Sequence, residues 1–282
     1  MTLLVLKIGG SIRDPDPLLR DVAEAVRDAS TRVVVVHGAS RDLNELSARL
    51  GHPPRMVESG RGDVTRFTDS TTMDHFLMAY AGLANKRIVE RLRQLGVNAL
   101  GLSGLDGGLV RGRRRSDLRV VDNGRARILH GNHVGSIEHV DGDLLTLLLD
   151  RGCTPALTPP IAAEDGTAIN VDGDRLAAEI AVALHADGLF IFADTPGILR
   201  DPDDDSTLLN ALAPDAVDSI SGRARPKVTA ALRASSNGVR DVRIADGRVQ
   251  HPLAAALGGA GTSVAGSGAG SLGGVARQVH VV

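Results

Sequence analysis

The sequence has very few aromatic side chains and no strong charge of one sign. Aromatic residues make up 2% of its 282 residues, and tryptophan does not occur. Stacking of aromatic rings on nucleic-acid bases is therefore not available as a binding mode. The formal net charge of -2 at pH 7 also argues against a general nucleic-acid binder.

Cysteine and long apolar runs are scarce as well. The single cysteine, Cys153, excludes an internal disulfide and a cysteine metal cluster, which suits a reducing compartment. No apolar stretch is long enough to span a membrane, and the first one is too short for a signal peptide. We therefore expect a cytoplasmic protein without a membrane partner. Hydrophobic residues make up 43% of the chain, which is enough for a full core.

Lysine is rare although the chain is rich in basic residues. Of 32 basic residues only Lys7, Lys86 and Lys227 are lysines. Lysine carries a compact charge that can follow a phosphoryl group, whereas arginine is a rigid planar fork. Two of the three, Lys7 before a glycine turn and Lys227 at a helix start, are therefore the leading candidates for chemistry in a chain that uses arginine almost everywhere else.

Lys7 lies in an apolar run that ends in two glycines. The run predicts a buried strand of a parallel sheet, with a ligand site beyond its carboxyl end. Gly9 and Gly10 allow positive φ and close approach, so their N-H groups can converge on an anion that Lys7 helps to neutralise. We expect a phosphate site here, with a simple tight turn as the alternative.

A second strand exit repeats this pattern. A helix over 17–28 and a buried strand over 32–38 complete a β-α-β unit. This strand leads into Gly38, Ala39 and Ser40, which would lie beside the first glycine turn in a parallel sheet and flank the same phosphoryl group. An ordinary strand-to-helix turn would give the same residues.

Further apolar patterns continue the alternation of strands and helices. They predict helices over 42–50, 71–95 and 144–150, strands over 98–104, 189–193 and 241–246, a strand over 154–160 that is stopped by prolines, and a closing strand near 261–264. The expected fold is a three-layer α/β/α sandwich with a mainly parallel central sheet and two lobes. We place the lobes at 1–165 and 166–264, followed by a flexible glycine-rich tail over 265–282.

An arginine-rich segment occupies residues 111–130. Its apolar stretches predict two strands of a hairpin, with Asn123-Gly124 at the turn. A basic hairpin on a protein of net negative charge implies an acidic partner or substrate, with a solvated ribbon as the alternative. The candidate contact residues are Arg111, Arg113, Arg114, Arg115 and Arg119.

Four residues at or near expected helix starts are also candidate site residues. Arg66 precedes an expected helix and suits bidentate recognition of a carboxylate, although a surface arginine would look the same. Asp172 and Asp174 at a helix start are good caps, and they could equally hold lysines or Mg²⁺. Lys227 in a first helical turn opposes the helix dipole, so a negatively charged neighbour or ligand is expected beside it.

Together these motifs resemble the amino acid kinase family, and within it the acylglutamate kinase group. The resemblance runs from residue 3 to about residue 264. Its motifs are Lys7–Ser11, His37–Gly38, Arg66–Asp69, Asn85–Arg87, Gly101–Gly104, Asn170–Asp174 and Lys227. Gly51–Arg55, Gly82–Arg87 and Gly101–Gly107 look more like the kinases that act on LysW-linked aminoadipate or glutamate than like N-acetylglutamate kinase.

The resemblance implies ATP-dependent phosphorylation of a side-chain carboxylate, giving an acyl phosphate for lysine or arginine biosynthesis. The substrate would be 2-aminoadipate or glutamate linked to a small acidic carrier protein, the partner of the arginine hairpin. N-acetyl-L-glutamate kinase is the first alternative, and a non-catalytic amino acid or nucleotide sensor of the same fold is the second. ATP with Mg²⁺ would bind the second lobe. A homodimer is expected, and no metal site of the protein's own.

The resemblance also implies roles for single residues. Lys7 and Lys227 would stabilise charge on the transferred phosphoryl group, and Asp174 would orient both lysines. The other implied roles are phosphate binding by Gly9, Gly10, Gly38, Ala39 and Ser40, substrate binding by Arg66 and Asn170, and nucleotide binding by Asp194, Thr195 and Gly197. The chain departs from the usual pattern at Ala39, where the family has glycine, and at Ala224 and Pro226 beside Lys227.

Overall fold

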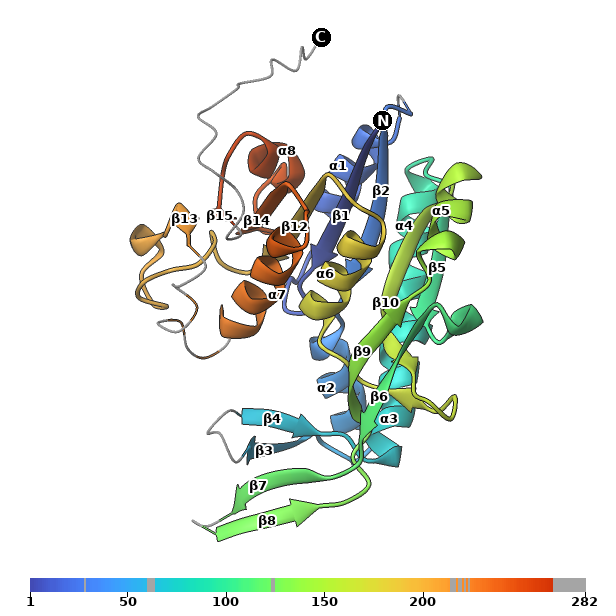
Figure 1. Cartoon of the computed structure of the whole chain (residues 1–282), viewed down its shortest axis with the longest axis vertical. Helices are drawn as coiled ribbons and strands as arrows, with labels where there is room; N and C mark the ends of the chain where they lie inside the picture. Colours follow the sequence, from blue (N-terminus) through green and yellow to red (C-terminus); the bar gives the residue numbers. More distant parts are fainter. Residues whose placement is uncertain are drawn as a thin grey trace.

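The computed structural model describes residues 1–27, 29–59, 64–122, 125–213, 217, 220, 222 and 224–265. In this part of the chain a central sheet of eleven strands carries helices on both faces (Figure 1). Its path runs in the order β13-β15-β14-β12-β1-β2-β10-β6-β9, and β5 and β11 pair with β10. The strands are β1 Thr2–Ile8, β2 Thr31–His37, β5 Ala99–Gly104, β6 Val110–Arg115, β9 Val134–Val140, β10 Thr154–Ala162, β11 Ala168–Ile169, β12 Gly188–Ala193, β13 Ala211–Leu212, β14 Asp241–Asp246 and β15 Thr262–Val264.

The middle of this sheet is parallel, as the sequence predicts. Strand β1 pairs in parallel with β2 on one side and with β12 on the other, so that Lys7 lies opposite Val36 and Ile191. Antiparallel pairs join β6 to β9, β14 to β15, and β10 to β11. The carboxyl end of β1 therefore lies in the middle of the sheet edge where ligands of such folds bind.

The two faces of β1 pack into different cores. Val5 belongs to a cluster with residues of α5, α6 and α7, whereas Leu4 and Leu6 belong to a cluster with residues of α1, α4 and α8. This alternation explains the continuous apolar run, because helices cover both faces of the strand. The helices are α1 Asp16–Ala25, α4 Asn85–Gln94, α5 Gly142–Asp150, α6 Gly173–Ala183, α7 Ala224–Ser236 and α8 Pro252–Leu257. The predicted three-layer fold is confirmed.

A third, smaller core lies under the strand exits. It consists of apolar residues of α2 Ser40–Arg49, α3 Ser70–Phe76 and η1 Leu77–Ala84, together with Ala39. The predicted helix over 71–95 is present as α3, η1 and α4 in direct succession, and its middle part, η1, is a π-helix. Two short 3-10 helices, η2 Asp106–Gly108 and η3 Asp205–Thr207, complete the set in the described ranges.

A separate antiparallel sheet projects from the end of the molecule that carries α2 and α3 (Figure 1). Its order is β4-β3-β7-β8, with β3 Arg55–Ser59, β4 Val64–Phe67, β7 Leu118–Asp122 and β8 Arg125–Leu129. The predicted hairpin is β7-β8, and its turn at 123–124 lies outside the described residues, as does 266–282 of the predicted tail. The sequence prediction missed β3 and β4, and it wrongly placed Arg111–Arg115 in the hairpin; these residues belong to β6 of the central sheet.

The prediction that prolines stop the strand after 154–160 is also wrong. Strand β10 continues through Pro159 and Pro160 to Ala162. Its pairs with β2 and β5 end at Leu157 and Thr158, and its pairs with β11 begin at Ile161. The prolines lie between these two sets of pairs, where a missing N-H removes no ladder hydrogen bond.

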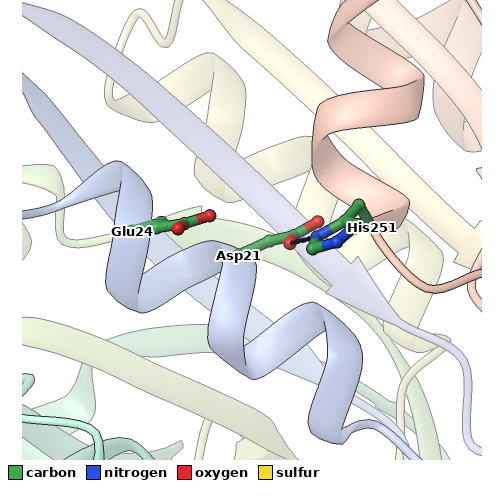
Figure 2. A group of neighbouring side chains, drawn as sticks. All are labelled: Asp21, Glu24 and His251. Atoms are coloured by element: carbon green, nitrogen blue, oxygen red, sulfur yellow. Dashed lines mark hydrogen bonds and ion pairs between the residues drawn. The ribbon is translucent and has the colours of Figure 1, made fainter. Parts of the chain in front are cut away.

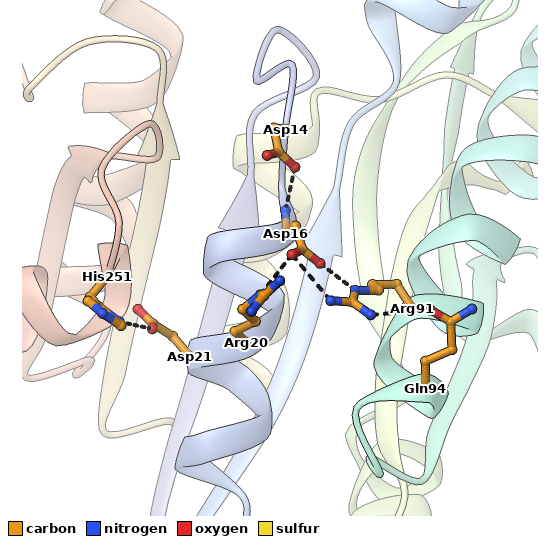
Figure 3. A network of polar contacts seen from close by, with 7 residues as sticks. All are labelled: Asp14, Asp16, Arg20, Asp21, Arg91, Gln94 and His251. Carbon is orange, nitrogen blue, oxygen red and sulfur yellow. Dashed lines mark hydrogen bonds and ion pairs between the residues drawn. The ribbon is translucent and has the colours of Figure 1, made fainter.

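Polar contacts of α1 connect it to helices distant in the sequence. Asp16 pairs with Arg91 of α4 (Figure 3). Asp21 accepts hydrogen bonds from the N-H groups of Leu253 (2.8 Å) and Ala254 (3.4 Å) at the start of α8. His251 Nδ1 lies 3.1 Å from the Asp21 carboxylate (Figure 2). Both carboxylate oxygens of Asp21 therefore have hydrogen-bond partners, and these contacts hold α8 against α1. None of the described helices is long and apolar enough to cross a bilayer.

Candidate active site

Two lysines from opposite ends of the chain meet on one carboxylate. Strand β1 carries Lys7, and the Nζ of Lys7 lies 2.6 Å from Asp174 Oδ1. Lys227, in the first turns of α7, places its Nζ 3.5 Å from Asp174 Oδ2. Asp174 itself lies in the first turn of α6, whose N-cap is Asp172. The negatively charged neighbour that Lys227 requires at a helix start is therefore Asp174.

The ion pair of Lys7 and Asp174 is buried, and this affects the pKa values of both groups. The side chains of Lys7 and Asp174 are 7% and 5% exposed, whereas that of Lys227 is 25% exposed. Burial acts to lower the pKa of Lys7, but the charge of Asp174 outweighs it and the pKa is raised. Burial acts to raise the pKa of Asp174, but the two lysines outweigh it and that pKa is lowered. Lys7 and Asp174 are therefore both ionised at neutral pH.

The two glycine turns contact each other directly beside this cluster. A Cβ on Gly10 would lie 2.9 Å from the backbone N of Ala39 and 2.7 Å from that of Ser40. The Gly38 N-H donates to the Ile8 carbonyl at 3.0 Å, and the Gly9 N-H donates to the Phe192 carbonyl at 3.0 Å. These contacts hold the exits of β1, β2 and β12 together, as the sequence predicts.

The sequence offers two reasons for glycine at Gly9 and Gly10, positive φ and close approach. Gly9, Gly10 and Gly38 are not among the glycines with positive φ, so the first reason does not apply. Close approach of the two turns is what excludes a side chain at Gly10. Ala39 has φ of -149°, a value open to any residue, which explains why alanine replaces the usual glycine.

Arg66 enters the same region from β4. Its Nη2 donates to Asn44 Oδ1 of α2 at 2.5 Å, and its guanidinium interacts with the buried hydroxyl of Tyr80. Tyr80 stacks on Phe76 with ring centroids 3.8 Å apart and lies in the small core with Ala39. Asn170 lies ahead of Asp172, and its N-H donates to the His133 carbonyl at 2.7 Å.

The proposed nucleotide residues lie at the neighbouring strand exit. Asp194, Thr195 and Gly197 follow β12, which pairs directly with β1. Thr195 Oγ1 donates to the Gly197 carbonyl at 2.8 Å, whereas Asp194 is exposed. In the described part of the chain, no hydrogen bond or ion pair links these residues to Lys7 or Lys227. They share the sheet edge with the lysines without touching them.

The comparison with protein families decides the family of the chain. The family model described as "Amino acid kinase family" matches residues 2–246. This chain belongs to the amino acid kinase family. The family expected from the sequence motifs is confirmed, and its match includes Lys7, Asp174 and Lys227.

Sequence relatives of this amino acid kinase family member include two kinds of kinase. The [LysW]-aminoadipate kinase of Deinococcus radiodurans is 43% identical over 269 residues, covering 94% of this chain and 92% of the relative. The [LysW]-aminoadipate kinase of Thermus thermophilus is 38% identical, covering 93% of this chain and all of the relative, 100%. An acetylglutamate kinase of Methanopyrus kandleri is 39% identical over 246 residues, covering 85% of this chain and 93% of the relative.

Solved structures of the same fold are also similar. N-acetylglutamate synthase of Neisseria gonorrhoeae matches with a TM-score of 0.75 at 27% identity, covering 99% of this chain and 62% of that one. Giardia carbamate kinase matches with a TM-score of 0.64 at 12% identity, covering 94% of this chain and 99% of that one. The second likeness concerns the fold alone.

The basic residues of this amino acid kinase family member are divided between the two sheets. On β6, Arg113 pairs with Glu138 (3.0 Å), and Arg114 donates to the Asn132 carbonyl (2.9 Å). Arg115, at the end of β6, and Arg119, on β7, are exposed and have no ion-pair partner within the described ranges. Arg111 is likewise exposed on β6. The positive charge that is open to a partner therefore lies where the central sheet meets the antiparallel sheet.

Sequence reasoning missed several residues that line or support the site. Tyr80 and Asn44 contact Arg66, and Tyr80 is the only tyrosine in the chain. The spacing of Phe76 and Tyr80 by one helical turn was a usable signal for an aromatic pair. Lys86, the remaining lysine, binds Asn85 and the Gly101 carbonyl instead of the lysine cluster.

Proposed function

We propose that this protein is an ATP-dependent kinase that phosphorylates the side-chain carboxylate of an amino acid, giving an acyl phosphate. The observation that carries the proposal is the convergence of Lys7 and Lys227 on Asp174, next to the paired glycine turns. Such a cluster offers two cations, with backbone N-H groups beside them, to a group that carries negative charge.

Positioning and charge neutralisation account for the chemistry. The attacking carboxylate is already ionised at pH 7, so no general base is required. It attacks the γ-phosphorus of ATP in line, and the bond to the ADP oxygen breaks as the bond to the acyl oxygen forms. Lys7 and Lys227 neutralise charge on the transferred group while Asp174 keeps both ammonium groups in place. Gly10 and Ser40 would supply backbone donors, because the N-H groups of Gly9 and Gly38 already donate to the Phe192 and Ile8 carbonyls and that of Ala39 faces the Tyr80 hydroxyl.

The nucleotide would occupy the exits of the later strands. Asp194, Thr195 and Gly197 lie beside β1 at the same edge, in the proposed nucleotide-binding lobe over 166–264. Mg²⁺ would arrive bound to the phosphates of ATP, since magnesium is commonly held by substrate oxygens and water. The lobe over 1–165 would bind the acyl substrate through Arg66 and Asn170. A cytoplasmic homodimer is part of the proposal.

The acyl substrate we favour is 2-aminoadipate or glutamate linked to a small acidic carrier protein. Two relatives that cover almost the whole chain are named [LysW]-aminoadipate kinase. The exposed Arg115 and Arg119 offer a cationic surface to such a carrier. The similarity to an acetylglutamate kinase supports N-acetyl-L-glutamate as the alternative substrate. The acyl phosphate formed from it would serve arginine biosynthesis.

Trapping the acyl phosphate with hydroxylamine tests the proposal. The purified protein is incubated with ATP and Mg²⁺ and with carrier-linked aminoadipate, carrier-linked glutamate or free N-acetyl-L-glutamate. We expect hydroxamate from a carrier-linked substrate at a higher kcat/KM than from N-acetyl-L-glutamate. The reverse order would establish the alternative substrate. Binding of ATP without hydroxamate from any substrate would instead indicate a sensor of the same fold.

A further inference from the structure

The side chain of Asn85, the first residue of α4, connects three strands of the central sheet. It is 1% exposed, and its Nδ2 lies 2.8 Å from the Ala156 carbonyl of β10 and 3.1 Å from His37 Nε2 of β2. Its Oδ1 lies 3.1 Å from Lys86 Nζ, which also donates to the Gly101 carbonyl of β5 at 3.2 Å. Asn85 therefore touches the base of the second glycine turn through His37.

These partners fix which way the amide points. The Ala156 carbonyl can only accept a hydrogen bond, and the Lys86 ammonium can only donate one. The amide nitrogen must therefore face Ala156 and His37, and the amide oxygen must face Lys86. His37 Nε2 then accepts from the amide, so the proton of the neutral ring lies on Nδ1. Nδ1 is 3.3 Å from the Gly38 carbonyl and donates to it.

The orientation of one peptide follows from this bond. The Gly38 carbonyl and the Ala39 N-H belong to the same trans peptide, so they point in opposite directions. Holding the carbonyl toward His37 holds the Ala39 N-H away from it, where it faces the Tyr80 hydroxyl, and the nitrogen of Ala39 lies beside Gly10. Thr158 Oγ1 fixes the preceding peptide by donating to the His37 carbonyl at 3.1 Å.

The side chains of Asn85 and Lys86 pack so closely on β5 that no side chain fits at Gly101. A Cβ on Gly101 would lie 2.1 Å from Asn85 Oδ1 and 2.9 Å from Lys86 Nζ, which explains a glycine inside β5. The charged groups that face His37 are Lys7 from β1 and Lys86 from α4. Burial, aided by these two cations, lowers the pKa of His37 to about 4, so its ring is neutral near pH 7.

We propose that Asn85 is a positioning residue that fixes the tautomer of His37 and thereby orients the Gly38-Ala39 peptide within the proposed phosphate-binding turn. The inference rests on the proposed kinase function for the role of that peptide. It also gives Lys86 a role, because its ammonium group fixes the orientation of the Asn85 amide.

The tautomer can be measured on the unmodified protein. Selective ¹⁵N labelling of histidine, with His37→Gln to assign the signal, reports which ring nitrogen carries the proton. We expect His37 to show the Nδ1-H tautomer from pH 6 to 8 without titrating. An Nε2-H tautomer, or titration in this range, would overturn the inference whether or not the protein is a kinase.

The variant Asn85→Asp tests the consequence for catalysis. A carboxylate accepts but does not donate, so His37 must carry a proton on Nε2, and its pKa is expected to rise. Below that pKa the doubly protonated ring still donates to Gly38, and above it the donation is lost. The kcat of the variant should therefore fall about tenfold or more as pH rises through this pKa, with the KM for the acyl substrate unchanged.

Ile88→Ala is the matched control, because Ile88 is buried on the same helix and does not contact His37. This variant should lose stability but keep the wild-type kcat and pH profile. A wild-type pH profile in Asn85→Asp, or the same altered profile in Ile88→Ala, would contradict the proposal while the unmodified enzyme remains active. Failure of the unmodified protein to form acyl phosphate would count against the kinase function instead.

Discussion

Asp174 is the residue on which the electrostatics of the site depend. Its carboxylate contacts both ammonium groups, and its side chain is 5% exposed. Removing the carboxylate would leave Lys7 buried without a counter-charge, which is more costly than removing an ordinary surface ion pair. The stability of the protein should therefore respond to this one oxygen-to-nitrogen change.

We expect Asp174→Asn to lower the free energy of unfolding by about 3 kcal/mol near pH 7. The lowered pKa of Asp174 makes its contribution present above the unfolded carboxyl pKa of about 3.9 and lost as pH falls through the folded value. The raised pKa of Lys7 makes its contribution present below about 10.4 and lost as pH rises through the folded value. The difference between wild type and variant should thus be full near neutral pH and shrink below about pH 4. It should also shrink at alkaline pH, where the buried Lys7 of the variant, without the Asp174 charge, loses its proton first.

Chemical denaturation at a series of pH values measures this difference. Glu45→Gln, which changes an exposed carboxylate of α2, is the control and should alter stability by less than about 0.5 kcal/mol. A loss in Asp174→Asn that did not shrink as pH falls from about 5 to below about 4 would show that another group dominates.

Single residues were predictable where their type was rare or their motif complete. The scarcity of lysine singled out Lys7 and Lys227, and the structure brings both to Asp174. Close approach at Gly10 was one of two predicted reasons for the glycine, and the sequence alone could not decide between them, because contact with Ala39 and Ser40 depends on a neighbouring strand. Local sequence permits positive φ at any glycine without showing whether the fold uses it.

At the scale of elements, the contact between α1 and α8 makes a separate prediction. Asp21 accepts the N-H groups of Leu253 and Ala254, which would otherwise be unsatisfied at the start of α8. We expect Asp21→Ala to lower the free energy of unfolding by about 2 kcal/mol, as for the loss of a strong helix cap. Thermal unfolding measures it.

Glu24→Ala on the same helix is the matched control. Glu24 lies close to Asp21 and His251 but is exposed (Figure 2). Equal losses in the two variants would mean that the charge of α1, rather than the cap of α8, stabilises this corner.

Helices and strands were predictable from the sequence where their apolar residues pack into a core. Buried strands such as β1 and β12 are continuous apolar runs, and they were found with their bounds nearly correct. Strands β3 and β4 were missed because they are short and leave large apolar side chains exposed, with Met56 at 54% and Val64 at 70%. The sequence prediction ends β10 too early because it treats Pro159 and Pro160 as a stop. In the structure these two prolines fall between the pairs with β5 and the pairs with β11, where no partner strand requires an N-H.

At the scale of the whole molecule, the site depends on contact between the two ends of the chain. Strand β12 of the later segment pairs with β1 of the earlier one, so a single sheet carries residues of both predicted lobes. Local pattern cannot show that Lys7 and Lys227 meet, because their distance is set by this pairing. Only the family resemblance predicted it from the sequence.

The surface at the junction of the two sheets predicts how a carrier protein would bind. Replacing Arg115 and Arg119 by alanine should lower kcat/KM for a carrier-linked substrate about tenfold at low salt and less at high salt. Turnover of N-acetyl-L-glutamate should not change. Initial rates of hydroxamate formation at several salt concentrations measure both effects.

Arg27 and Arg151 provide a control with the same change of charge. Both are exposed and precede β2 and β10, at the opposite edge of the central sheet. Their double alanine variant should keep wild-type kcat/KM with every substrate. An equal loss in both double variants would point to net charge rather than to a docking surface.

The most direct test of the central claim is the single-turnover rate of acyl phosphate formation in Lys7→Met and Lys227→Met, with ATP and the preferred acyl substrate saturating. If both ammonium groups act on the transferred phosphoryl group, each variant should fold and bind ATP, yet lose about 3 kcal/mol of transition-state stabilisation, a rate reduction of at least about 100-fold. A rate near that of the wild type in either folded variant would contradict the account.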